Sequence, residues 1–166
     1  MNPTSQTSQA EAVLNAILTR FATTVAPSGS PGAGTPLCGV STGPDLSQVR
    51  GRKLPWLIVA LSDLQRRRVT VDGQVETEAA LDLTVNDAAS PETDALLLAY
   101  RWAAWLESIL ILEAERPGGP ALDNTVDWIE PDGIHLDAGG IGFSGFTVRA
   151  RFRLRYSTAL GNPFTS

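Results

Sequence analysis

Residues 66–87, RRRVTVDGQVETEAALDLTVND, contain the pattern that decides the fold. The dipeptide DG is a strong turn signal, and the residues around it alternate between apolar and polar over many positions. A two-residue loop would pair apolar with polar residues and so mix the two faces of the hairpin. A three-residue loop, 71–73, with glycine at the left-handed bulge position instead pairs Val69 with Val75. We therefore predict a hairpin with the longer loop.

This register also pairs Arg68 with Glu76 and Arg66 with Glu78. Successive side chains of a strand point to opposite faces, so the second arm of the hairpin has a core face and an outer face. The expected core residues are Val75, Thr77, Ala79, Leu81, Leu83 and Val85, and the expected outward residues are Glu76, Glu78, Asp82 and Asn86.

The segment before the hairpin, LPWLIVALSD at 54–63, is apolar at both alternating sets of positions. A strand of this kind is covered on both faces. Either the chain itself or a partner must supply the second cover.

Two further strands are expected at 124–137 and 142–156, with a bulge or bend at Pro131-Asp132-Gly133. In TVRARFRLRY, residues 147–156, apolar residues alternate with Arg149, Arg151, Arg153 and Arg155. One face of this strand should therefore close the core while the other carries four guanidinium groups.

Two helices complete the prediction. The first covers 8–25, because Ser8 and Glu11 have capping-box spacing and an apolar stripe follows. The second begins at Ser90, continues for about 22 residues and ends before RPGGP at 116–120. Residues 26–53, rich in Gly, Pro and Ser, are expected to form a long loop or arm.

The chain is thus predicted to be a single α+β domain, 1–166, with a mainly antiparallel sheet of about five strands and both helices on one face. The sheet and the long helix occupy 54–157, and 158–166 form a tail. No stretch resembles a membrane span or a signal peptide, so we expect folding in the cytoplasm and no membrane partner.

The predicted outer face is unusually basic for a chain of net charge -5. We count six arginines there against three acids, and expect the surplus to contact acidic residues of a neighbouring subunit. The candidate interface residues are Arg66, Arg68, Arg149, Arg151, Arg153, Arg155, Glu76, Glu78 and Asp82.

Residues that could carry chemistry are few. The only histidine, His135, is expected on an exposed strand face, and the sequence around Ser144 lacks the spacing of a nucleophile elbow. Cys38 is the only cysteine, so no internal disulfide can form. The outward acids of the hairpin are interpreted as partners of arginine rather than as a cation site. We expect no enzyme activity, no metal and no cofactor.

The chain resembles the tail terminator, or tail-completion, proteins of long-tailed bacteriophages. The resemblance lies in the order of elements: an N-terminal helix, LPWLIVAL followed by the charged hairpin, the helix DALLLAYRWAAWLESIL, and a final hairpin ending in GFTVRARFRLRYS. It covers roughly residues 8–157 and includes no short diagnostic motif. The loop at 26–53 departs from the family pattern.

This resemblance implies a structural virion protein that assembles into a hexameric ring in the host bacterial cytoplasm. Such a ring caps the tail tube and joins it to the head-side connector protein, while DNA only passes through the lumen. Three alternatives stay open: a connector or stopper protein of the neck, a nucleic-acid binder that uses the arginine face, and an α+β binding domain of unknown ligand. The nucleic-acid binder is disfavoured because the residues between the arginines point to the opposite face of the strand, which leaves no aromatic side chains among the guanidinium groups for base stacking.

Overall fold

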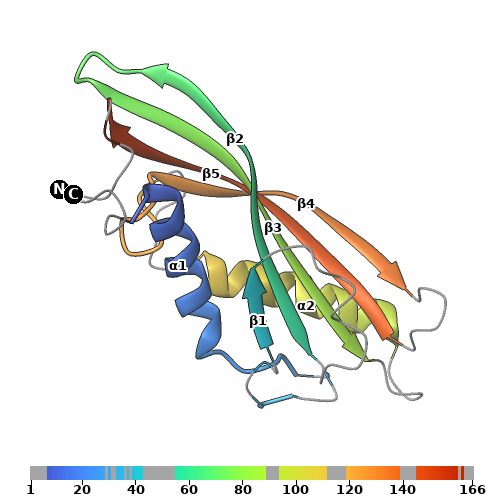
Figure 1. Ribbon diagram of the computed structural model, residues 1–166. Helices are drawn as coiled ribbons and strands as arrows, with labels where there is room; N and C mark the ends of the chain where they lie inside the picture. Colours follow the sequence, from blue (N-terminus) through green and yellow to red (C-terminus); the bar gives the residue numbers. More distant parts are fainter. Residues whose placement is uncertain are drawn as a thin grey trace.

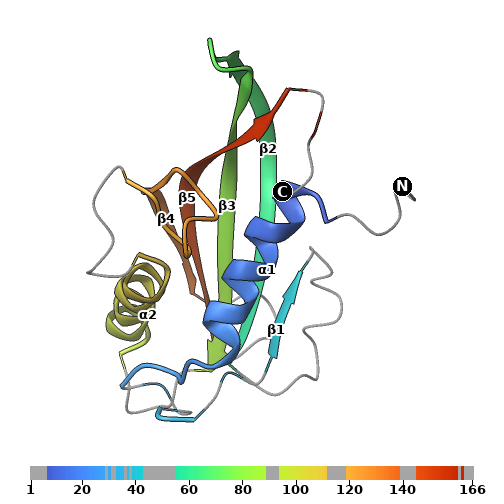
Figure 2. The ribbon, with the colours of Figure 1, turned by 90° about the vertical axis from the view of Figure 1, so that its left-hand side faces the viewer.

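The structure is a computed structural model that describes residues 7–28, 30, 33–35, 37, 39–42, 55–88, 94–111, 119–138, 145–160 and 162 (Figure 1). It is an α+β fold in which two helices cover one face of an antiparallel sheet (Figures 1 and 2). The helices are α1 (Gln9–Ala22) and α2 (Ala95–Leu110). The antiparallel strands are, in sheet order, β2 (Trp56–Val69), β3 (Gln74–Ala88), β5 (Gly145–Ala159) and β4 (Trp128–Ala138).

The segments that form strands in the structure differ from those predicted from the sequence. The segments expected as two strands, 54–63 and the first arm of the hairpin, form the continuous strand β2. A short strand, β1 (Gly39–Thr42), pairs in parallel with the outer edge of β2 and lies in the range predicted as a long loop. Residues 43–53 of that loop lie outside the described residues.

The turn of the β2–β3 hairpin is confirmed. Gly73 has a φ of 73°, and Thr70 N–H donates to the Gln74 carbonyl at 2.8 Å around a three-residue loop. Val69 pairs with Val75 as predicted. The sequence alone therefore determines the register next to the turn.

Further from the turn the predicted register is wrong. Arg68 pairs with Glu76, but Arg66 lies opposite Thr77 instead of Glu78. The pairing shifts between Arg66 and Arg68 and again between Ser62 and Gln65. Asp63, in the second irregularity, has a φ of 52°. Such bulges insert unpaired residues into one strand, and each one displaces the residues beyond it.

The pairing of β3 with β5 joins the two hairpins and shows no irregularity from Gln74↔Ala159 to Ala88↔Gly145. Along β3, all six predicted core residues are buried. Along β5, the inward positions are also buried and consist of Val148, Ala150, Phe152, Leu154 and Tyr156. The predicted alternation is confirmed along β5, and along β3 for Glu76, Glu78 and Asp82, which are only partly buried. The prediction is wrong for Asn86, which was expected to face outward and is buried.

Helix α1 begins as predicted. Ser8 is its N-cap, and Ser8 N–H donates to Glu11 Oε2 at 2.8 Å in a complete capping box. Val13, Ile17 and Phe21 are fully buried. The helix ends at Ala22 instead of residue 25, so Val25, which the periodicity assigned to the apolar stripe, is exposed.

Helix α2 begins later than predicted. Its N-cap is Asp94, whose Oδ1 accepts hydrogen bonds from Leu96 N–H and Leu97 N–H, and the predicted N-cap Ser90 lies outside the described residues. The helix has 16 residues and its C-cap is Ile111, so it is shorter than expected. No described helix combines the length and the apolar character needed to cross a bilayer.

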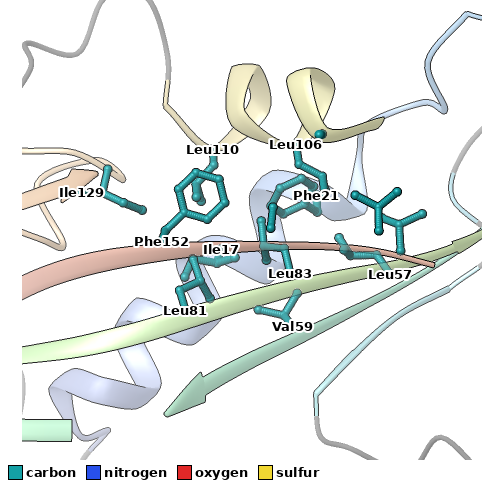
Figure 3. Close-up of a cluster of buried hydrophobic side chains, with 14 of the residues drawn as sticks. Ile17, Phe21, Leu57, Val59, Leu81, Leu83, Leu106, Leu110, Ile129 and Phe152 are labelled. Carbon is teal, nitrogen blue, oxygen red and sulfur yellow. The ribbon is translucent and has the colours of Figure 1, made fainter. Parts of the chain in front are cut away.

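The core lies between the helices and the sheet (Figure 3). Ile17 and Phe21 of α1 and Leu106 and Leu110 of α2 point toward the strands. The strands contribute Leu57, Val59, Leu81, Leu83, Phe152 and Ile129. Trp102 is fully buried and its ring meets that of Trp105 edge-on, with centroids 5.0 Å apart.

One charged group, Asp87 near the end of β3, is buried on this apolar side. Its Oδ2 accepts hydrogen bonds from Trp102 Nε1 at 2.9 Å and from Ser30 Oγ at 2.8 Å. The segment around Ser30 is itself closed by hydrogen bonds between Ala26 and Thr35 and between Gly34 and Ala26. This part of the predicted arm is therefore attached to the core.

Candidate interaction surfaces

The arginine face is the side of the sheet opposite the helices, and its central feature is the row Arg149, Arg151, Arg153 and Arg155 on β5. The first three side chains are exposed and the fourth is partly buried. The predicted residues Arg66 and Arg68 belong to β2, but their side chains lie outside the described part of the structure.

Arg151 has the best-defined partner on this face. Its Nε and Nη2 donate to the two carboxylate oxygens of Asp82 at 2.9 and 3.0 Å, which is the bidentate geometry. This hydrogen bonding, helped by the charge of Asp82, raises the pKa of Arg151 above its ordinary value. Arg151 is therefore a permanent cation whose partner lies within the chain.

Acids that the sequence analysis did not count lie beside the next two arginines. Arg153 lies 3.5 Å from Asp132 and 3.8 Å from Glu130, both on β4. The predicted bulge at Pro131 is confirmed by a register shift between Pro131 and Gly133, and Asp132 is the additional residue there. Because of this insertion, two acids reach one arginine.

Arg155 also has acidic neighbours from both adjoining segments. Its guanidinium lies 3.7 Å from Glu76 on β3 and 3.9 Å from Asp127, just before β4. It also lies 5.5 Å from the ring centroid of Trp128. The predicted count of six arginines against three acids is therefore wrong, because it omitted the acids at and before β4. Whether the face contacts another subunit stays a prediction.

Arg149 differs from the other three, since it forms no ion pair among the described residues. It lies opposite His135 of β4, which is exposed as predicted. A shallow hollow of about 330 Å³ lies beside them, lined also by Asp82, Gly133, Ile134 and Arg151. Two adjacent N–H groups of this kind can donate hydrogen bonds to a carboxylate of another molecule.

The other candidate sites find no support as catalytic or metal centres. No cluster of three or more metal-ligating side chains occurs within the described ranges. Of the three acids weighed as a cation site, Asp82 and Glu76 are next to arginines and Glu78 also has a partner. Cys38 and Ser144 lie outside the described residues.

Exposed apolar side chains occur at the turn of the β2–β3 hairpin, which projects beyond the helices (Figures 1 and 2). Val71 is fully exposed, and Val69 and Leu160 are 56 and 62% exposed. Leu160 N–H donates to the Gly73 carbonyl at 2.8 Å, so the end of β5 lies against this turn. We call Val69, Val71 and Leu160 the hairpin tip.

A second exposed apolar group lies on α2. Leu96, Leu97 and Tyr100 are 53 to 57% exposed and occupy adjacent positions on the first turns of the helix. Ala104, one turn further, is also exposed. We call these four residues the α2 stripe. This exposed group was not predicted from the sequence, although the helical period places its members on the side opposite the buried Leu98, Trp102 and Leu106.

The hairpin tip and the α2 stripe are at opposite ends of the subunit. Strand β3 leads away from the tip for 15 residues, or about 50 Å at ~3.4 Å per residue. Helix α2 begins seven positions after β3 ends, at the lower end of the molecule in both ribbon views. One copy of the chain cannot bring these two surfaces together.

Comparison of the sequence with the models of known protein families gives no match, and comparison with curated proteins gives none either.

Proposed function

We propose that this chain is the structural subunit of a homo-oligomeric ring and that the ring is the tail terminator of a long-tailed bacteriophage. The observation that carries the proposal is the presence of exposed apolar side chains at two opposite ends of one subunit. Large apolar side chains gathered in patches are typical of interaction sites. Two different patches at opposite ends favour head-to-tail contact, which closes into a ring when the rotation between copies permits.

The order of elements supports the phage assignment. The described chain has an N-terminal helix, a long charged hairpin, one helix rich in alanine and tryptophan, and a final hairpin, in the order on which the resemblance to tail terminators depends. In this proposal the ring caps the tail tube and meets the head-side connector protein, and the protein has no catalytic role.

The test is to image the purified full chain by electron microscopy and to measure its mass in solution, alone and with phage tail tubes. Six-fold rings at tube ends are the expected result. A protein that stays monomeric at high concentration contradicts the ring, and rings that bind filled heads but ignore tubes indicate a stopper instead.

The arginine face is tested in the same assay with Arg149→Glu. Reversal of Arg151 or Arg153 would also disrupt ion pairs inside the subunit, whereas Arg149 has none among the described residues. Loss of rings by a folded Arg149→Glu variant supports a role of this face in assembly. If the variant forms rings normally, the arginine face is not part of the interface.

A further inference from the structure

Arg149 is a cation of the arginine face with no acidic partner among the described residues. It is exposed, whereas Arg151, Arg153 and Arg155 each lie beside at least one acid. Its cross-strand neighbour on β4 is His135, which is also exposed. Both residues line the same open hollow of about 330 Å³. A guanidinium group and an imidazole therefore border one space that is open to solvent.

The acids of this face gather around the other arginines of β5. Arg149 lies between Thr84 of β3 and His135 of β4, so neither of its cross-strand neighbours is acidic. Asp82 is the one acid among the residues that line the hollow. Both of its carboxylate oxygens accept hydrogen bonds from Arg151. The negative charge at the hollow is thus already paired, and that of Arg149 is not.

Three further acids lie on the elements that adjoin His135. Asp132 of β4 lies 3.5 Å from Arg153 and does not line the hollow. Glu107 of α2 lines a separate hollow. Asp137 shares the strand face of His135 by alternation, and its side chain lies outside the described part of the structure. The described acids of β4 and α2 therefore leave the hollow itself to its nitrogen donors.

We infer that this hollow binds a single oxyanion group, a carboxylate or a phosphate, between Arg149 and His135. The planar guanidinium group can donate two parallel hydrogen bonds to such a group. The imidazole adds an N–H donor and, when protonated, a positive charge. The inference concerns a small anion and does not depend on the proposed ring.

Nuclear magnetic resonance can observe this site alone, because His135 is the only histidine of the chain. Isotope-labelled histidine gives ring signals from one imidazole. The full chain is titrated with sodium acetate and with sodium sulfate, and with sodium chloride at the same ionic strength. The signals should shift to saturation with an oxyanion and not with chloride. Saturation by acetate alone indicates a carboxylate site, and saturation by sulfate alone indicates a site for phosphate-like groups. Signals that respond equally to all three salts overturn the inference.

The role of the arginine is tested with Arg149→Gln, which keeps a polar side chain but removes the charge. Hydrogen bonds to charged groups contribute enough that the affinity should fall roughly tenfold or more. The matched control is Arg101→Gln, an exposed arginine of α2, which should bind as the original protein does. Equal affinities of Arg149→Gln and the original protein would overturn the inference.

The hollow itself is tested at Gly133, which forms part of its lining. A Cβ added at Gly133 would meet no atom within 4 Å, so Gly133→Leu can occupy the space without displacing its walls. This variant should keep its circular dichroism spectrum and lose affinity for the anion. A folded Gly133→Leu variant with the original affinity would place the anion elsewhere and overturn the inference.

The role of the histidine is tested by pH. Sulfate keeps its charge over the range in which histidine titrates, so a change in affinity reports on the protein. Sulfate should bind more tightly at about pH 5.5 than at about pH 8, because protonated His135 adds a positive charge and a second donor. Equal affinities at the two pH values would remove His135 from the site and overturn the inference.

Discussion

The two faces of the sheet are formed by the same strands, yet different interactions hold them. On the side of the helices, β3 and β5 contribute side chains that are almost completely buried. On the arginine face, Arg151 and Arg153 of β5 form ion pairs in which at least one partner is substantially exposed. Burial of apolar surface stabilises a fold strongly, whereas exposed ion pairs contribute little. Most of the stability should therefore come from the face that the helices cover. Substitutions of the exposed arginines on the other face should change the free energy of unfolding little.

The largest expected effect tests this contrast at neighbouring positions of β5. Phe152→Ala leaves a cavity under the helices and should lower the free energy of unfolding by about 3–5 kcal/mol. Arg153→Ala, one residue on, removes exposed ion pairs and should cost about 1 kcal/mol or less. Denaturation with urea, monitored by tryptophan fluorescence, measures both. Equal losses would mean that the arginine face is as important for stability as the core.

An intermediate effect is expected where a charge lies on the apolar side. Asp87→Ala removes the acceptor of Trp102 Nε1 and Ser30 Oγ, leaving a buried donor without a partner, which should cost about 1–3 kcal/mol. The matched variant Ser30→Ala leaves the bond to Trp102 in place and should cost less. The same denaturation curves compare the two variants, and a Ser30→Ala loss as large as that of Asp87→Ala would contradict this assignment.

The smallest effect is expected at the start of α1, the helix that covers the β2 side of the core. Hydrogen bonds from the backbone and then the side chain of Ser8 hold the pKa of Glu11 below its ordinary value of 4.5. A carboxyl with a lowered pKa stabilises the fold above its unfolded pKa, and this contribution is lost as the pH falls through the folded pKa.

Glu11→Gln should therefore melt slightly below the original protein at neutral pH, and the difference should vanish in acid, at a pH below the lowered pKa of Glu11. Thermal melts followed by circular dichroism measure the difference at both pH values. A gap that widens in acid would show that Glu11 acts in another way.

The faces of β3 and β5, the hairpin turn and the start of α1 were predictable because each depends on local pattern. Alternation defines a strand face, and glycine after aspartate selects the turn. The pairing of Arg66 was not predictable, since the register shift between Arg66 and Arg68 has no sequence signal as strong as that of the turn. The start of α2 was misassigned because Ser90 and Asp94 are both good N-caps.

The partners of the arginines were missed for a different reason. Asp132 was predicted to lie in a bend. Which residue of β5 it would reach depends on the register between β4 and β5, and the local sequence does not determine that register. The exposed stripe of α2 was missed because the sequence of a helix does not show which of its side chains another part of the chain will cover.

The regular pairing of β3 with β5 has a consequence for how the chain folds. Each hairpin joins strands that are close in sequence, whereas the β3–β5 pairing joins residues as distant as Gln74 and Ala159. Contacts between such distant residues slow folding, because a long loop must close before the contacts stabilise it. We therefore expect the two hairpins to form early and their union along β3 and β5 to limit the rate. Folding rates of variants at this pairing, compared with variants inside either hairpin, measure that order of events.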